Sequence, residues 1–141
     1  MRTLYLTGLT LLLTACAAPA PAMITTAPAA WPEGMAYRAA SVSEHGRDRP
    51  LVPGTRLRIR FDRPGFVVLE AGCNMIGVSS QLTDGRMTEV GFTATAMGCA
   101  PERLAQDAWL VDFFGAGPAV VITTDAVVFS TTDAEIRLIL D

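Results

Sequence analysis

One stretch of this sequence has the period of a helix, and strand-length runs surround it, so the chain must place a single helix on a sheet. Pro101 suits the first helical position, and Glu102 favours the positive end of the helix dipole. The apolar residues that follow recur at helical spacing and predict one apolar face, made of Leu104, Ala108, Leu110, Val111, Phe113 and Phe114. Gly115, Gly117 and Pro118 end the helix.

The rest of the domain has the rhythm of short strands and turns. Residues 55–62 alternate strictly, so Leu57, Ile59 and Phe61 face a core while the arginines between them face solvent. Asp84-Gly85 predicts a tight hairpin. The seven or eight expected strands are residues 37–43, 55–62, 66–71, 77–82, 86–90, 119–123, 127–130 and 136–140. Because one helix needs a wide apolar surface, we expect an α+β fold in which a strongly curved antiparallel sheet of about seven strands packs around it.

Residues 1–16 have the pattern of a bacterial lipoprotein signal peptide. Arg2 precedes an apolar run over residues 4–13, which is shorter than the ~20 residues that span a bilayer. The run closes with Leu-Thr-Ala-Cys at residues 13–16, which resembles a lipobox, so we expect Cys16 to carry lipid and to anchor the chain in a membrane. The alternative is an ordinary signal peptide cleaved after the Ala15-Cys16-Ala17 site, which would remove the cysteine.

Residues 17–35 read as a tether. Proline and alanine without apolar periodicity cannot bury enough surface to offset the entropy of ordering, so the folded domain is expected over residues 36–141. Ala17 stands where an aspartate would mark inner-membrane retention in Gram-negative lipoproteins. We therefore expect a lipid-anchored protein of the bacterial cell envelope, in the outer membrane and facing the periplasm if the host is Gram-negative.

Three short motifs, in this order, resemble the META domain family, which includes the HslJ-like heat-shock proteins. They are Ala-Gly-Cys-Asn at residues 71–74, Thr-Ala-Met-Gly-Cys at 95–99 and Gln-Asp-Ala-Trp-Leu at 106–110. The family-motif residues are Gly72, Asn74, Thr95, Met97, Asp107 and Trp109. Residues 52–55 and 61–62 extend the match, which covers roughly residues 37–140.

The sequence departs from the family at Ala96, where many members carry arginine or glutamate, and at Leu69, where many carry glycine. The segment after Asn74 is one residue shorter than usual. The resemblance implies a small α+β domain, secreted or lipid-anchored, in a family associated with stress or drug tolerance. It implies no defined reaction, cofactor or ligand.

Cys73 and Cys99 are expected to form a disulfide. If Cys16 carries lipid, an even pair remains for an oxidising compartment. The bond would close a loop of about 26 residues and contribute roughly 3.5 kcal/mol in the chain-entropy estimate. The alternatives are two buried thiols or one reactive thiolate, which needs a nearby base or cation.

The residue types argue against catalysis, metal binding and nucleic-acid binding. Neither Cys73 nor Cys99 belongs to a C-x-x-C motif, and a lone histidine, His45, is most often a solvated loop residue beside a glycine. The net charge of -3 disfavours nucleic acid.

Carboxylates occur at Glu70, Glu89, Asp107 and Asp112, but no pattern places two of them across a cleft. Asp107 is suited to cap or bond the neighbouring sheet, and Trp109 to pack between helix and sheet. We expect no enzyme activity and no cofactor.

Two functions remain open at this point. In the first, the domain of an envelope lipoprotein binds or steadies another envelope component. In the second, it is a small-molecule or inhibitor-type binding module in the periplasm that uses an open end of the curved sheet. A conical apolar pocket favours the second, whereas an exposed apolar patch favours the first.

Overall fold

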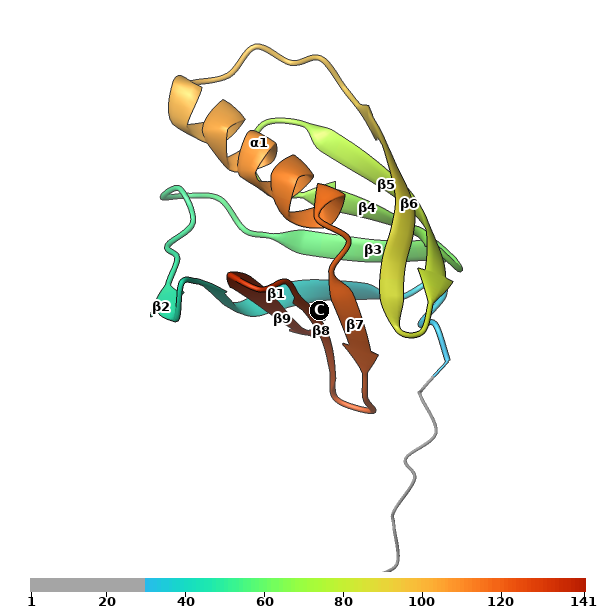
Figure 1. Cartoon of the computed structure of the whole chain (residues 1–141). Helices are drawn as coiled ribbons and strands as arrows, with labels where there is room; N and C mark the ends of the chain where they lie inside the picture. The colour runs from blue at the N-terminus through green and yellow to red at the C-terminus, as the bar shows by residue number, and fades with distance from the viewer. Residues whose placement is uncertain (1–29) are drawn as a thin grey trace, which may run out of the picture.

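The computed structural model describes residues 30–141 as one sheet and one helix (Figure 1). The strands are β1 (Ala36–Glu44), β2 (Arg47–Asp48), β3 (Arg58–Arg63), β4 (Phe66–Glu70), β5 (Met75–Thr83), β6 (Arg86–Ala94), β7 (Ala119–Ile122), β8 (Ala126–Ser130) and β9 (Ala134–Leu140), and helix α1 is Pro101–Gly115. The expected signal peptide, Cys16 and residues 17–29 of the expected tether lie outside the described residues. Between residues 30 and 141, no helix has the length and apolar character needed to cross a bilayer.

The α+β class is confirmed, but the sheet has nine strands, one more than the eight ranges named and more than the seven or eight expected. The additional strand is β2, which lies in residues that the sequence assigned to a loop. His45 and Gly46 both have positive φ, at 51° and 73°, and this turn folds the chain back so that Glu44 pairs with Arg47. Because β2 contains no apolar residue, nothing in its own composition indicates a strand.

The strands form a circuit of antiparallel pairings. Their order is β2-β1-β3-β4-β5-β6-β7-β8-β9, and β1 also pairs with β9 along most of its length. The link between β6 and β7 is the weakest, since it consists of the single pairing of Arg86 with Ala119. Helix α1 packs beside β6 and lies across the sheet on this side (Figure 1). The helix therefore covers the place where the sheet is least closed.

The inside of this circuit is filled by side chains. Phe61, Phe114 and Phe129 are fully buried, and the ring of Phe129 lies 5.2 Å from that of Phe114 and 6.2 Å from that of Phe61. The rings of Trp31 and Phe61 pack edge to face, with their centroids 5.0 Å apart. The core thus includes Trp31, a residue that the sequence assigned to the tether.

Helix α1 begins and ends where the sequence predicted, but its buried face is different. Leu104 and Ala108 are exposed, although their spacing placed them on the apolar face. The buried residues are Gln106, Asp107, Leu110, Phe113 and Phe114. The first part of the helix thus buries polar side chains, and these bind backbone groups of the sheet.

The expected hairpin and the expected exposed face of β3 are both confirmed. Asp84 and Gly85 have positive φ, at 50° and 73°, in the turn between β5 and β6. Leu57, Ile59 and Phe61 are buried. The arginines between them lie outside and pair with acids: Arg58 donates to Asp141 at 2.6 Å and Arg60 to Asp62 at 2.6 Å.

Candidate functional site

The carboxylate of Asp107 is the centre of the motif cluster. Its side chain reaches from α1 to the turn after β4, where it accepts the backbone N–H of Cys73 at 3.1 Å and of Asn74 at 2.7 Å. The side-chain amide of Asn74 donates to the same carboxylate at 3.1 Å. Asp107 is only 6% exposed, so its carboxylate has lost its hydrogen bonds to water. The N–H donors of Cys73 and Asn74 compensate for that loss. The expected bond between Asp107 and the sheet is present.

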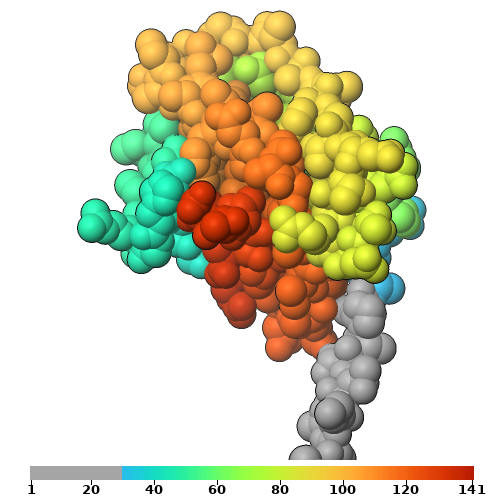
Figure 2. Space-filling model, viewed as in Figure 1, coloured from blue at the N-terminus to red at the C-terminus, as the bar shows by residue number. Residues whose placement is uncertain are grey.

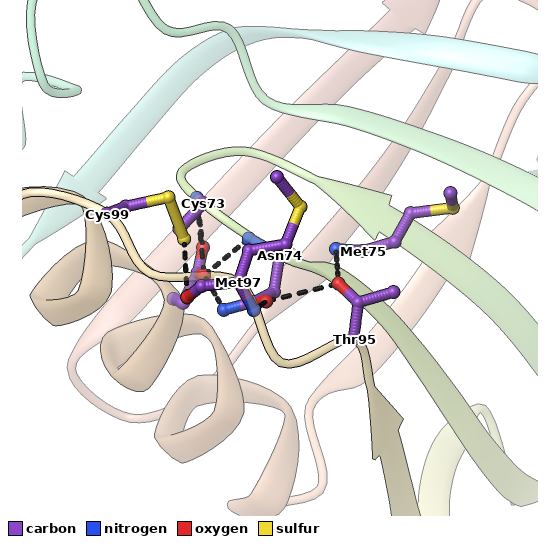
Figure 3. The surroundings of a disulfide bond; sticks show 7 residues. Cys73, Asn74, Met75, Thr95, Met97 and Cys99 are labelled. Carbon is purple, nitrogen blue, oxygen red and sulfur yellow. Dashed lines mark hydrogen bonds between the residues drawn. A yellow bond between two sulfur atoms is a disulfide. The ribbon is translucent and has the colours of Figure 1, made fainter.

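Asn74 connects this turn to the segment that precedes the helix (Figure 3). Its side-chain oxygen accepts the hydroxyl of Thr95 at 3.1 Å and the backbone N–H of Met97 at 2.9 Å. The Thr95 oxygen in turn accepts the backbone N–H of Met75 at 3.1 Å. One asparagine therefore bonds to helix α1, through Asp107, and to residues 95–97 at the same time.

Cys73 and Cys99 form the disulfide that the sequence predicted, with their Cα atoms 5.8 Å apart (Figure 3). The bond joins the turn after β4 to the residue two positions before α1. Both cysteines are half-buried. The disulfide and the Asn74 hydrogen bonds therefore hold the same two segments together.

Gly72 is required by the close approach of α1 to the turn. A Cβ atom at this position would lie 2.5 Å from a carboxylate oxygen of Asp107 and 2.6 Å from the carbonyl oxygen of Arg103. Both distances are shorter than real Cβ contacts. Gly72 thus lets Asp107 reach the backbone N–H groups of Cys73 and Asn74.

Gln106 is a buried anchor that the sequence analysis did not single out. Its side-chain oxygen accepts the backbone N–H of Val52 at 2.7 Å, and its nitrogen donates to the Thr55 hydroxyl at 3.0 Å and to the carbonyl of Ala71. The sequence feature that could have indicated this role is its position beside Asp107. Two adjacent polar residues before the apolar part of a helix are candidates for buried hydrogen bonds. Gln106 and Asp107 together bond α1 to the loop before β3 and to the turn after β4.

Trp109 lies apart from this cluster, further along α1. Its ring stacks on Phe113 at 5.5 Å, and its indole N–H donates to the carboxylate of Glu44 at 2.8 Å. Arg49 donates to the same carboxylate at 2.8 Å and lies over the Trp109 ring at 4.3 Å. The hydrogen bond from Trp109 and, next, the charge of Arg49 hold the pKa of Glu44 below its ordinary value. Trp109 packs between helix and strand, as expected. Its hydrogen bond to Glu44 was not predicted from the sequence.

An open hollow of about 350 Å³ lies beside the motif cluster. Its lining offers guanidinium, amide, hydroxyl and thioether groups, and it includes Arg56, Glu70, Asn74, Met75, Thr95, Met97 and Arg103. Met97 is 59% exposed and Met75 is 47% exposed. Across the described residues, 30–141, no group of three His, Cys, Asp or Glu side chains is placed to hold a metal ion. The functional groups that line this hollow are suited to binding.

A second, shallower hollow of about 260 Å³ adjoins the first along the outside of the sheet. The two share Met75 and Thr95. Its floor is apolar, because the ring of Phe66 lies over Gly77, where an added Cβ would come within 3.1 Å of that ring. We call the two hollows together, from Arg56 and Arg103 to Phe66, the motif face.

The structure thus brings five of the six family-motif residues together and separates the sixth. Gly72, Asn74, Thr95, Met97 and Asp107 meet at one end of the sheet. Trp109 lies with Glu44. The other carboxylates named from the sequence do not join this cluster as a pair: Glu70 lies 4.0 Å from Arg60, and Glu89 bonds to Gln81 on the β5–β6 hairpin.

Comparisons with known proteins agree with the fold. Two solved structures match the fold. One is an NMR structure of a protein at 19% identity, with a TM-score of 0.57 over 77% of this chain and 90% of that chain. The other is an NMR structure of a protein from Burkholderia xenovorans at 15% identity, with a TM-score of 0.58 over 89% of this chain and 99% of that chain. No curated protein sequence matches significantly.

The family model described as META domain matches residues 33–140, which include every strand, the helix and both cysteines of the disulfide. The chain therefore belongs to the META domain family.

Proposed function

We propose that this chain is a lipid-anchored protein of the bacterial cell envelope whose META domain holds another envelope protein without catalysing a reaction. The anchor is Cys16, and the binding surface is the motif face. The observation that carries the proposal is the exposure of Met75 and Met97 on a surface that the disulfide and the Asn74 hydrogen bonds hold rigid.

Exposed methionines on a rigid support are suited to protein contact. Their thioether side chains adapt to different partner shapes, and burying them removes apolar surface from water. The shape of the surface supports a protein partner over a small molecule, because the motif face is open and the inside of the sheet is filled by Phe61, Phe114 and Phe129. The alternative, a periplasmic small-molecule or inhibitor-type module, would have to use the same open hollow.

The position of the chain's entry supports an anchored arrangement. Trp31 packs on Phe61, and the backbone N–H of Gly34 donates to the carbonyl of Phe61 at 2.7 Å, so the chain enters the domain at the far end of β3. The larger hollow of the motif face lies at the other end, where Arg58 pairs with Glu70. Figure 1 shows the first described residues at one end of the molecule and the loop before α1 at the other. Five residues of extended chain, about 17 Å, separate Arg56 from Phe61, so a tether at the entry would leave the larger hollow free for a partner.

Cell fractionation and mass spectrometry test the anchor. In the wild type we expect the chain in the membrane fraction, with a diacylglycerol-modified cysteine as its first residue. Cys16→Ser should release the chain from that fraction. A mature N-terminus after residue 17, without lipid, would overturn this part of the proposal.

Site-specific photocrosslinking in cells tests the binding surface. The chain contains no lysine, so amine-reactive crosslinkers are poorly suited, and a photoreactive amino acid at position 97 or 75 is needed. Val121 on β7, 55% exposed, provides the matched control. We expect one discrete protein adduct from positions 97 and 75 that position 121 does not give. The same adducts from all three positions, or none from 97 and 75, would contradict a binding role for the motif face.

A further inference from the structure

The motif face carries two arginines that no other group in the described chain engages. Arg56 precedes β3 and Arg103 lies in the first turn of α1, and both line the larger hollow. Within residues 30–141, neither guanidinium makes a hydrogen bond or an ion pair, whereas Arg49, Arg58 and Arg60 are all paired with carboxylates.

The Gln106 anchor joins the two segments that bring these arginines to one hollow. Gln106 donates to Thr55, the residue before Arg56, at 3.0 Å. Arg103 lies three residues before Gln106 and therefore on the same side of the helix, one turn nearer its start. The lining of the hollow includes these two cationic side chains together with Met75 and Met97.

The charge of the hollow is the reverse of the charge of the chain. The whole chain has a formal net charge of -3. The lining contains two arginines and one carboxylate, Glu70, which lies 4.0 Å from Arg60 outside the hollow. Asp107 lies beneath the floor, where it accepts the N–H groups of Cys73 and Asn74. The exposed charge of the hollow is thus positive, which complements an anionic ligand.

We propose that this hollow binds a carboxylate-bearing peptide segment, with its acidic groups on Arg56 and Arg103 and its apolar side chains on Met75 and Met97. The inference rests on the proposed function and names the chemistry of the partner. Arginine's planar guanidinium binds a carboxylate through two parallel hydrogen bonds. The adjoining apolar floor at Phe66 and Gly77 extends the surface along the sheet, so an extended segment that alternates acidic and apolar residues matches it.

A peptide is favoured over an anionic lipid by the geometry of the anchor. The chain enters the domain beside Phe61, at the opposite end from Arg56 and Arg103. Five residues of extended chain, about 17 Å, separate Arg56 from Phe61, so the hollow lies away from the segment that leads to the proposed anchor.

Fluorescence polarisation with defined peptides tests the proposal. The probe is a fluorescein-labelled Leu-Glu-Leu-Glu-Leu-Glu peptide, and its uncharged counterpart is Leu-Gln-Leu-Gln-Leu-Gln with an amidated end. The purified full chain in a nonionic detergent is expected to bind the acidic peptide saturably and to bind the uncharged one at least tenfold more weakly. Arg56→Gln and Arg103→Gln should each raise the Kd for the acidic peptide by about tenfold. Added salt should weaken the wild-type binding.

Arg137→Gln on β9 is the matched control, because Arg137 is exposed, carries the same charge and does not line the hollow. Its Kd should equal that of the wild type, and the unfolding midpoints of all three variants should be unchanged. The proposal is overturned if the wild type shows no saturable binding, or if Arg137→Gln weakens binding as much as Arg56→Gln and Arg103→Gln. It is also overturned if phosphatidylglycerol vesicles bind in an Arg56-dependent manner while the peptide does not.

Crosslinking separates failure of this inference from failure of the proposed function. If position 97 still captures its partner when both Arg56 and Arg103 are glutamine, the motif face binds a protein but not through a carboxylate. In that result the proposed function stands and the peptide chemistry is wrong.

Discussion

The carboxylate of Asp107 accepts the backbone N–H of Asn74 at 2.7 Å, across 33 residues of sequence and from helix to turn. The same carboxylate also accepts the backbone N–H of Cys73 and the side-chain amide of Asn74. This contact positions Asn74, whose oxygen in turn holds Thr95 and Met97. The shape of the motif face therefore depends on one buried acid, and the helix that carries this acid lies at the front of the domain in Figure 2 (orange).

Asp107→Asn should destabilise the domain by about 3 kcal/mol. With the amide oxygen at the Oδ2 position, the amide nitrogen would face the N–H of Cys73 in place of Oδ1, and the charge that strengthens the bonds from Cys73 and Asn74 would be lost. Urea unfolding followed by circular dichroism measures the effect. Asp112→Asn, an exposed acid on the same helix, is the control and should stay within about 0.5 kcal/mol of the wild type. Equal losses for the two variants would contradict the role assigned to Asp107.

Gly72→Ala should destabilise the domain by about 3 kcal/mol, because its methyl group would overlap the Asp107 carboxylate and the Arg103 carbonyl. Gly98→Ala is the matched control, since nothing lies within 4 Å of a Cβ at that position. The change at Gly98 should be about 0.5 kcal/mol or less. Thermal unfolding of both variants distinguishes a packing requirement at Gly72 from a general intolerance of this region.

Removing the disulfide should lower the free energy of unfolding by about 3.5 kcal/mol, since Cys73 and Cys99 are 26 residues apart. The Cys73→Ser/Cys99→Ser variant should keep the native circular dichroism spectrum, because Asp107 and Asn74 hold the same segments. A reductant should lower the stability of the wild type and leave the double variant unchanged. Two titratable thiols at these positions in the non-reduced mature protein would refute the bond.

The bond between Trp109 and Glu44 should make stability depend on pH on the acid side. The pKa of Glu44 is lowered from its ordinary 4.5, chiefly by the Trp109 hydrogen bond and then by the charge of Arg49. The unfolded chain therefore takes up a proton at higher pH than the folded chain does. The stabilising contribution is complete above about pH 4.5 and is lost as the pH falls through the folded pKa.

Trp109→Phe keeps an aromatic ring beside Phe113 but removes the indole N–H. The stability difference between this variant and the wild type should be larger at pH 7 than at an acid pH below the lowered pKa of Glu44, where the carboxyl is protonated. Urea unfolding across this pH range measures it. In a Glu44→Gln background the pH dependence of that difference should disappear; if it persists, another carboxyl group is responsible.

Local patterns were sufficient to predict most elements of the fold. The alternation of Leu57, Ile59 and Phe61, the Asp84-Gly85 turn and the Pro101 helix start all depend on neighbours in sequence, and each was confirmed. The strand count was wrong at β2, because its pairing is imposed by the positive φ of His45 and Gly46 and not by its own residues. The helix face was wrong at Leu104 and Ala108, because spacing identifies an apolar stripe but not which stripe the sheet covers.

By itself, the sequence determined the class of fold and the helix, because helical and strand periods and turn preferences are local properties. It also determined the pair of cysteines, because two remain once Cys16 is assigned to lipid. Only the tertiary structure decided which groups Asp107 bonds, that Gln106 is buried beside it, that Trp109 bonds Glu44, and that Arg56 and Arg103 line one hollow with Met75 and Met97. The physical reason is that a buried polar group is stable only beside its partner. These partners lie 33 to 65 residues away in sequence, where no local pattern can indicate them.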